Sequence, residues 1–394
     1  MRSYSLALAL VSCKPTHVPD VASPGPPVVE ESAEESVAGT QPRARTISWS
    51  LDGKTCESAG LATDAIVAIY DDGLERRERD TGALTWRRPI RGWLSNDDET
   101  AYVATGADLI AVDIDGGAER WRHSAPAGAT FQSPVAIDGE TLYVADNRLL
   151  GAKQMIVGPS WLHALDAETG ALRWNVELPT GVIAAAPTFD RERIYVVREF
   201  GLSAVSKARQ AVEWSTHQAT SRTSAVAVAD RLLVPAHKLF GVSAADGSEA
   251  WNIPGHTLST VEPQVHEGLA YAVIPAHRRV PNTSRWFVSS LAELEPAAGE
   301  LRWQQWFEQP VRGTVAVTAD RIHAAAWDGK LYELDRRSGE VRWSMDLGLG
   351  KGSPTVLTDD EAVYVCGNKR LLRIDLPPPE PRMGSHHGRL AQKG

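Results

Sequence analysis

Residues 335–347 read DRRSGEVRWSMDL, and residues 166–178 read DAETGALRWNVEL. Both stretches place a glycine four positions after an aspartate and a tryptophan four positions after that glycine. Related phrases recur along the chain and end at seven tryptophans: Trp86, Trp121, Trp174, Trp214, Trp251, Trp303 and Trp343. The glycine is present in six of the seven phrases, and Gln210 replaces it in the other. Self-similarity of this kind indicates a repeat architecture.

The spacing of the phrases indicates the kind of repeat architecture. Successive tryptophans lie 35, 53, 40, 37, 52 and 40 residues apart, which suits one four-stranded propeller blade per repeat, with insertions in two. Each repeat also contains short β-rich runs bounded by turn residues, such as DGETLYVADN at 138–147 and KLYELD at 330–335. We expect the glycine to supply the positive φ that the turn needs. We expect the tryptophan to pack between neighbouring blades.

The two ends of the repetitive region look like halves of one repeat. Trp49 precedes Trp86 by 37 residues but has no glycine turn before it, and the last repeat breaks off in prolines after Asp375. We therefore expect the strand around Trp49 to pair with the strand around Leu372 and to close a ring without free sheet edges. The predicted fold is all-β, an eight-bladed β-propeller of four-stranded antiparallel blades over residues 45–376.

Composition limits the classes of partner and site. The net charge is −9, which argues against a nucleic-acid partner because phosphate binding needs a basic face. Three cysteines are too few for a disulfide framework and lack the spacing of a zinc site. Cys56 and Cys366 both belong near the closing blade. They either form a disulfide that locks the closure in an oxidising compartment or remain separate thiols, one of them buried in a strand.

The chain begins with a short segment that resembles an export signal. Arg2 precedes an apolar run that is far too short to span a bilayer as a helix. The letters LVSC at 10–13 resemble the lipobox of bacterial lipoproteins, which implies that Cys13 is lipidated and, with Lys14 next, that the outer membrane is the destination. A cleaved secretory signal and an incidental cysteine in a disordered start are the alternatives.

The segments that flank the predicted propeller differ from it in composition. Residues 14–44 are rich in Pro, Glu, Ser and Ala and contain no aromatic residue. Such a segment cannot bury enough apolar surface to fold, so we expect a disordered tether between residues 1–13 and the propeller. Residues 377–394 are predicted to be a disordered tail, in which His386 and His387 are not expected to bind a metal.

Two repeats are longer than the others, and their extra residues are predicted to lie between the second and third strands of a blade, on one propeller face. The inserts are residues 145–161 and 275–286. Loops on a rigid scaffold often carry binding, and Arg and Trp are favoured at interfaces. The candidate partner-binding residues are Leu149, Leu150, Met155, Ile156, Arg278, Arg279, Arg285 and Trp286. Alternatively, the inserts fold over the face and pack on it.

The repeated phrase, D-x-x-[ST]-G-x-x-x-W, resembles the PQQ-type propeller repeat over nearly the whole body. A lipobox, a linker and a lone eight-bladed propeller together resemble the BamB family of outer-membrane assembly lipoproteins. This resemblance implies a monomeric, non-catalytic scaffold that is lipid-anchored in the outer membrane and faces the periplasm. It implies a protein partner, such as a barrel-assembly complex, and neither cofactor nor metal.

Two other hypotheses remain. A PQQ-dependent dehydrogenase is expected to be longer, and many such enzymes carry adjacent cysteines and calcium ligands. This sequence has no adjacent cysteine pair, and its acidic clusters at 96–100 and 358–362 fall where hairpin turns are predicted. No other catalytic motif can be placed. A ligand- or glycan-sensing propeller is the third hypothesis, because propeller mouths often bind small molecules.

Overall fold

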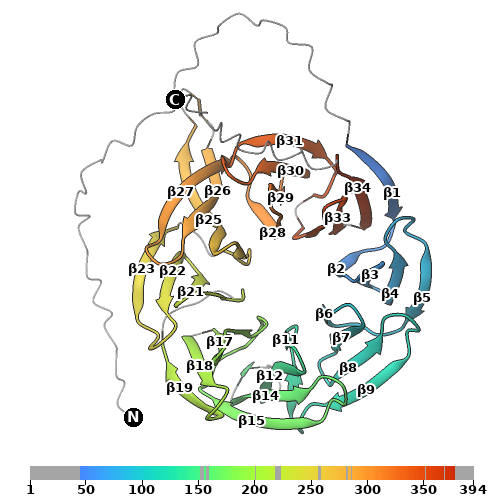
Figure 1. The fold of residues 1–394 in the computed structure, drawn as a ribbon, viewed down its shortest axis with the longest axis vertical. Coiled ribbons are helices and arrows are strands. Elements are labelled where there is room, and N and C mark those ends of the chain that lie inside the picture. Colours follow the sequence, from blue (N-terminus) through green and yellow to red (C-terminus); the bar gives the residue numbers. More distant parts are fainter. Residues whose placement is uncertain are drawn as a thin grey trace, which may run out of the picture. The chain divides into compact units, whose positions relative to one another are not determined.

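The computed structural model describes residues 45–150, 155–156, 159–199, 201–217, 223–255, 259–280, 283–284, 286–350, 352–367 and 369–377. In this part of the chain the elements are β-strands, without a helix, and they form eight antiparallel sheets arranged in a ring (Figure 1). The predicted all-β, eight-bladed propeller is confirmed.

The first four blades follow one another along the chain. Their strands are β2 (Cys56–Leu61), β3 (Ala65–Tyr70), β4 (Gly73–Glu78) and β5 (Leu84–Arg88); β6 (Trp93–Asn96), β7 (Thr100–Ala104), β8 (Asp108–Asp113) and β9 (Glu119–Ser124); β10 (Ala129–Phe131), β11 (Ala136–Asp138), β12 (Thr141–Leu150), β13 (Met155–Ile156), β14 (Ser160–Asp166) and β15 (Leu172–Leu178); and β16 (Thr188–Phe189), β17 (Arg193–Arg198), β18 (Gly201–Ser206) and β19 (Ala211–Ser215).

The remaining four blades complete the ring. Their strands are β20 (Val226–Val228), β21 (Arg231–Pro235), β22 (Lys238–Ser243) and β23 (Glu249–Pro254); β24 (Gln264–His266), β25 (Leu269–Arg279), β26 (Trp286–Glu295) and β27 (Glu300–Phe307); β28 (Val311–Val317), β29 (Arg321–Ala326), β30 (Lys330–Asp335) and β31 (Val341–Asp346); and β32 (Thr355–Thr358), β33 (Ala362–Gly367), β34 (Arg370–Asp375) and β1 (Thr46–Asp52). We call these the fifth, sixth, seventh and closing blades.

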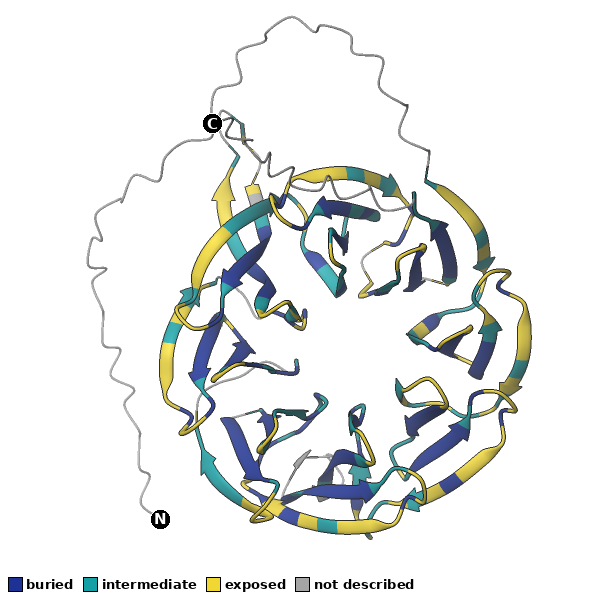
Figure 2. Cartoon of the chain, viewed as in Figure 1, coloured by how far each residue is buried: buried dark blue, intermediate teal, exposed yellow. Residues whose placement is uncertain are grey.

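The middle strands of the blades form the core. Every residue of β3 and of β33 is buried, because neighbouring blades cover both sides of these strands. Their sequences, AIVAIY and AVYVCG, are accordingly near-continuous apolar runs rather than alternating ones. Exposed residues concentrate on the outermost strands, which form the rim (Figure 2).

The tryptophan of each repeated phrase lies on the outermost strand of its blade and contacts the next blade. Trp121 on β9 donates its indole N–H to the carbonyl of Ala167 at 2.9 Å, and its ring covers Gly170 in the same turn. A Cβ added to Gly170 would lie 2.4 Å from that ring. Within the described ranges, six tryptophans donate their indole N–H to a carbonyl of the next blade, at 2.7–3.1 Å: Trp49, Trp86, Trp121, Trp214, Trp251 and Trp303.

The glycine of the phrase therefore has two functions. Gly170 has φ +70°, as the turn requires, and it leaves room for the tryptophan of the preceding blade. Only the first function was expected from the sequence. Gln210 takes the same backbone conformation with φ +52°, which is strained for a residue with a side chain.

The ring closes as predicted. Strand β1 pairs antiparallel with β34, with Trp49 opposite Arg373 and Ser50 opposite Leu372. Arg45, just before β1, adds an ionic contact to the seventh blade: its Nε donates to Glu333 at 3.1 Å. Glu333 is fully buried and also contacts the Nε2 of His323 at 3.1 Å. The first described residue of the chain is thus fixed to the core.

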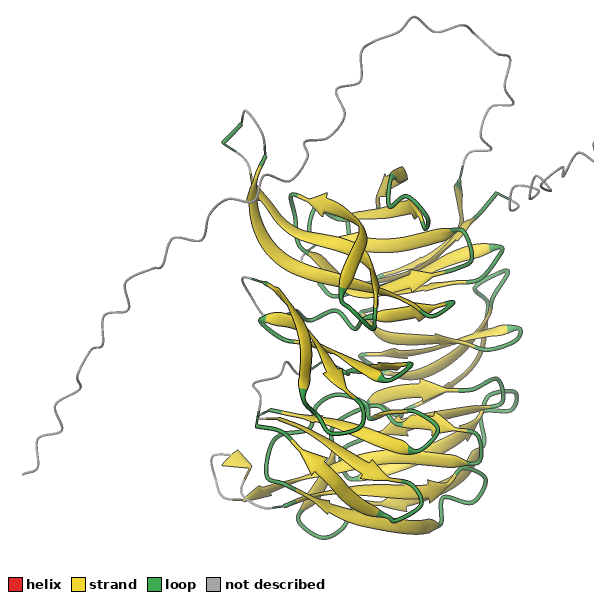
Figure 3. Ribbon diagram, turned by 60° about the vertical axis from the view of Figure 1, so that its left-hand side comes forward, coloured by secondary structure: helices red, strands yellow, loops and turns green. Residues whose placement is uncertain are grey.

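Blade topology gives the ring two different faces, visible from the side in Figure 3. The turn face carries the hairpins between first and second strands and the glycine turns between third and fourth strands. The insert face carries the connections between second and third strands and between blades. Residues Arg45 and Pro377, at the two ends of the described chain, lie on the turn face, because Thr46 pairs with Asp375 at the end of β34.

The two core cysteines form a disulfide in this structure. Cys56 on β2 and Cys366 on β33 have Cα atoms 5.3 Å apart, and the bond joins the first blade to the closing blade. We predict the same pairing in solution. Titration of the unfolded, unreduced Cys13→Ser variant should find no free thiol, and reduction should cost about 2–5 kcal/mol of unfolding free energy. Two free thiols before reduction would refute the pairing.

Candidate functional site

The thirteen tryptophans of the chain divide into two groups. Eight, namely Trp49 and the seven that end the repeated phrases, lie on outermost strands and pack between blades. The other five are Trp93, Trp161, Trp286, Trp306 and Trp327. These five occupy different positions in their repeats, so the packing of one blade on the next does not require them.

All five of these tryptophans lie at strand ends on the insert face. Trp93 begins β6, Trp161 is the second residue of β14, and Trp286 begins β26. Trp306 is the penultimate residue of β27, and Trp327 directly follows β29. First and third strands start on the insert face, whereas second and fourth strands end there, so each position falls on the same side of the ring. Tryptophan is enriched at protein interfaces, which makes this face the candidate site.

The second predicted insert forms a long hairpin rather than a loop. Strands β25 and β26 continue beyond the sheet, with Arg278 opposite Phe287 and Arg279 opposite Trp286. The register shifts between Pro275 and Arg278, and such a bulge bends the hairpin out of the sheet. Figure 3 shows the hairpin projecting from the insert face, and Trp286 is 52 % exposed. The hairpin therefore does not pack flat on its own propeller face.

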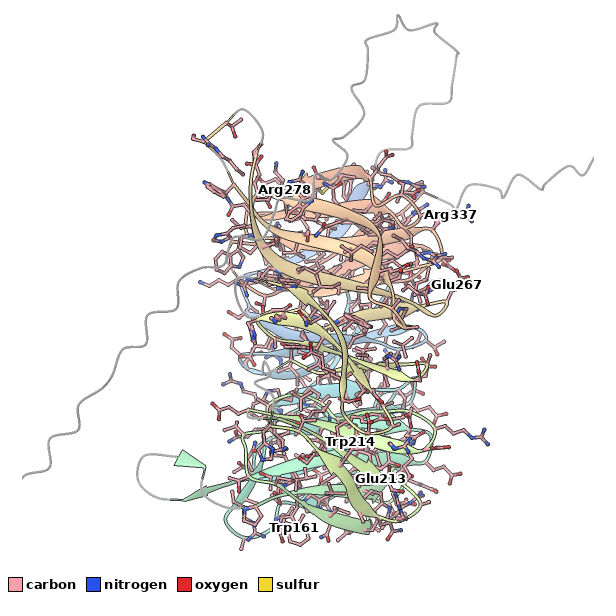
Figure 4. The ribbon with its side chains drawn as sticks, turned by 90° about the vertical axis from the view of Figure 1, so that its left-hand side faces the viewer. Trp161, Glu213, Trp214, Glu267, Arg278 and Arg337 are labelled. Carbon is pink, nitrogen blue, oxygen red and sulfur yellow. A yellow bond between two sulfur atoms is a disulfide. The ribbon has the colours of Figure 1, made fainter. Side chains whose placement is uncertain are left out.

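Arginine and tryptophan side chains gather around this hairpin. The guanidinium of Arg278 lies 5.3 Å from the centroid of the Trp306 ring, and that of Arg312 lies 4.6 Å from the Trp327 ring. Both are cation–π distances. We name the group of Arg278, Trp286, Trp306, Arg312 and Trp327 the arginine–tryptophan surface. It spans the sixth and seventh blades, and Figure 4 shows Arg278 on the side opposite Arg337 and Glu267.

Two adjacent hollows open beside this surface. The larger, which we name the interblade cavity, has a volume of about 440 Å³ and is bordered by Thr260, Val261, His277, Arg312 and Trp327 among others. The second measures about 390 Å³ and includes Trp306 and Tyr332 in its wall. Glu308 and Gln309 border both hollows. A partner that covers the surface would therefore find concave features on the same face.

The first predicted insert is only partly described. Leu149 and Leu150 end β12 and pair with Ile156 and Met155 of β13, but the positions of their side chains lie outside the described residues. The same holds for Arg285 and for Cys13. Their roles in partner binding and lipidation stay predictions.

The base of the first insert is held by buried polar groups. Asp146 accepts a hydrogen bond from the backbone N–H of Trp161 at 2.8 Å and contacts the Nε2 of His163 at 3.1 Å. Asn147 accepts the N–H of Ile183 at 2.9 Å. These contacts fix the direction in which both arms of the insert leave the blade.

The acidic clusters of the sequence serve as hairpin turns. Asp97 accepts the backbone N–H groups of Glu99 and Thr100, and Asp359 accepts those of Glu361 and Ala362. Across the described ranges, no group of three or more His, Cys, Asp or Glu side chains is arranged to hold a metal ion. In the same ranges, no helix has the length and apolarity needed to cross a bilayer.

The sequence prediction included only part of the surface. Arg278, Arg279 and Trp286 were expected on a partner-binding insert, and they lie exposed on one hairpin. Trp306, Arg312 and Trp327 were not expected, because they lie in segments that look like ordinary strand ends. A usable signal did exist, namely that these tryptophans fall outside the repeated phrase.

A comparison with protein families gives one match over most of the chain. The model of the family described as outer membrane protein assembly factor BamB matches residues 33–154, 105–266 and 284–376. The matched ranges include seven whole blades and, in the sixth blade, β24, β26 and β27 but not β25.

Solved structures with the same fold have diverse functions. BamB from Moraxella catarrhalis superposes with a TM-score of 0.60 at 15 % identity, covering 84 % of this chain and 100 % of that chain. Quinohemoprotein alcohol dehydrogenase from Comamonas testosteroni gives a TM-score of 0.64 at 13 % identity, covering 86 % and 78 %. At such identities the similarity establishes the fold alone.

A curated relative has a much longer chain. The serine/threonine-protein kinase AfsK of Streptomyces griseus is 31 % identical over 142 residues, which are 32 % of this chain and 16 % of the kinase. The match thus spans only a small part of that protein and about a third of this chain.

Proposed function

We propose, since the chain belongs to the family of the outer membrane protein assembly factor BamB, that it is a non-catalytic scaffold in the assembly of outer-membrane proteins. In this proposal Cys13 carries a lipid anchor in the outer membrane, residues 14–44 form a tether, and the propeller works in the periplasm as a monomer. Its insert face binds a protein of the barrel-assembly complex.

The gathering of the five non-repeat tryptophans on one face is the observation that carries this proposal. Blade packing does not require them, and three of them, Trp286, Trp306 and Trp327, lie close to arginines and two hollows on the sixth and seventh blades. Interfaces draw most of their energy from such Trp and Arg anchors. A catalytic role has less support, because the similarity to a quinohemoprotein dehydrogenase concerns the fold alone.

The position of the chain ends agrees with a membrane-tethered scaffold. Arg45 and Pro377 lie on the turn face. The proposed tether therefore joins the propeller on the face opposite the proposed partner surface.

We predict that two substitutions on the hairpin abolish partner capture. Affinity-tagged protein in membrane extracts should recover a barrel-assembly component, and the Arg278→Ala/Trp286→Ala variant should recover at least about tenfold less, as expected for hot-spot residues. Leu301 is also an exposed apolar residue, but it lies near the turn face together with Arg337. The matched Arg337→Ala/Leu301→Ala variant should therefore capture like the parent protein.

The outcome can also refute the proposal. If the parent protein recovers no barrel-assembly component, the scaffold function loses its support. If both double variants recover the component equally well, a partner is bound, but not through the arginine–tryptophan surface.

A further inference from the structure

The interblade cavity is held open by hydrogen bonds within the chain. Ser289 donates its hydroxyl to the carbonyl of Gln309 at 3.2 Å and accepts the N–H of Val311 at 3.1 Å. On the other wall, Ser259 donates to the carbonyl of Val273 at 3.2 Å. These bonds tie the connection between the fifth and sixth blades, and that between the sixth and seventh blades, to the base of the β25–β26 hairpin. A pre-formed cavity binds a ligand with little cost of ordering.

The wall of this cavity contains N–H donors that lack an acceptor. Arg312 donates from Nη1 to Thr260 at 2.6 Å, but its Nε and the Nε1 of Trp327 are buried without a hydrogen-bond partner. Among the described residues, no carboxylate lies within ion-pair distance of Arg312. Buried donors without acceptors are rare and destabilising, so an acceptor that reaches either nitrogen would stabilise this wall.

The turn face of the same two blades gives a direct contrast. A hollow of about 510 Å³ there is also bordered by arginines, among them Arg302 and Arg336. Each of these has a carboxylate partner within the chain, Glu295 at 3.1 Å and Glu267 at 2.7 Å. Arg302 and Arg336 are thus neutralised within the chain, whereas among the described residues Arg312 has no such partner.

The rest of the lining restricts the ligand further. Val261, Val273, Val288 and Val311 provide aliphatic surface beside the guanidinium. A ligand that fits must combine one anionic acceptor with apolar groups. Among the described residues that border the cavity, Arg312 is the one arginine or lysine, so the wall offers a counter-charge to a single acidic group.

We propose that the interblade cavity binds a single acidic side chain, flanked by apolar residues, in an extended segment of the partner protein. The carboxylate lies on Arg312, and the flanking side chains contact the valines. This inference rests on the proposed function, because it names the chemistry by which the scaffold recognises its partner.

Peptide selection tests the inference without knowledge of the partner. Random twelve-residue peptides displayed on phage are selected against the immobilised full-length protein and, in parallel, against its Arg312→Gln variant. Peptides enriched on the parent should carry one Asp or Glu between apolar residues. In a synthetic copy of a selected peptide, replacing the Asp or Glu by Asn or Gln should weaken binding at least tenfold. The Arg312→Gln substitution in the protein should have the same effect. Arg312→Lys should give an intermediate loss of affinity, because lysine keeps the positive charge but lacks the planar guanidinium that can form two parallel hydrogen bonds to a carboxylate.

Control variants separate this inference from the proposed function. Arg337→Gln on the turn face should bind the peptide as the parent does, and unchanged thermal unfolding of Arg312→Gln excludes misfolding. Failure to enrich any peptide, enrichment without acidic residues, or equal binding by Arg312→Gln would overturn the inference. If Arg312→Gln still captures a barrel-assembly component while the hairpin double variant does not, the proposed function stands and only this inference falls.

Discussion

A Trp121→Ala variant is expected to lose about 3–5 kcal/mol of unfolding free energy, as large-to-small substitutions at buried aromatic sites do. Trp121 is only 8 % exposed, its ring contacts Tyr102 at a centroid distance of 5.9 Å, and its indole bonds to Ala167 of the next blade. The substitution would leave a void between the second and third blades and an unpaired carbonyl. Denaturant unfolding followed by tryptophan fluorescence measures the loss.

Trp286→Ala is the matched control for this prediction. Its side chain is 52 % exposed at the start of the hairpin, so the free energy of unfolding should change by no more than about 0.5 kcal/mol. The same chemical change should thus strongly destabilise the propeller at one position and leave its stability nearly unchanged at the other. Equal effects on stability would show that the division into blade-packing and surface tryptophans is wrong.

Arg45→Ala is expected to have the second large effect, about 3–5 kcal/mol at neutral pH. The substitution removes the cation that neutralises Glu333, whose side chain is fully buried, and a buried charge without a partner is strongly destabilising. Arg302→Ala is the control. Arg302 is 51 % exposed where it pairs with Glu295, so its loss should cost less than about 1 kcal/mol.

The pH dependence of the Arg45→Ala effect has a definite sign. Burial opposes the ionisation of Glu333, but hydrogen bonds from His323 and Arg45 outweigh it and lower its pKa to about 2 from the ordinary 4.5. Between about pH 2 and pH 4.5 the unfolded chain binds a proton at Glu333 that the folded chain does not bind. The stabilisation by ionised Glu333 is therefore complete above about pH 4.5 and is lost as the pH falls toward 2. The difference between parent and variant should therefore be larger at pH 7 than at pH 3. A difference independent of pH would contradict an ionic role.

Much of the fold could be predicted because each blade repeats one local pattern. The glycine turn, the tryptophan and the apolar middle strands are encoded within about forty residues, so the sequence shows this pattern seven times, with the glycine in six. Pairing of the strand at Trp49 with the strand at Leu372 followed from the incomplete repeats at the two ends. The packing of Trp121 on Gly170 was not predicted, because it joins two phrases from different blades.

The candidate site was harder to predict for a related reason. Arg278 and Trp286 stood out because an insert interrupts the repeat. Arg312 and Trp327 lie within normal-length blades, and only the ring places them next to the hairpin of the neighbouring blade. Periodicity identifies equivalent positions, but it does not show which unlike residues of two adjacent blades meet at a face.

Site-specific photo-crosslinking in intact cells tests the central claim most directly. A photoreactive amino acid is introduced at Arg278 on the insert face or at Arg337 on the turn face, two exposed positions of neighbouring blades. We predict that irradiation links the position of Arg278 to a barrel-assembly component and that the position of Arg337 gives no such adduct. Adducts from Arg337 alone, or equal adducts from both positions, would contradict the assignment of partner binding to the insert face.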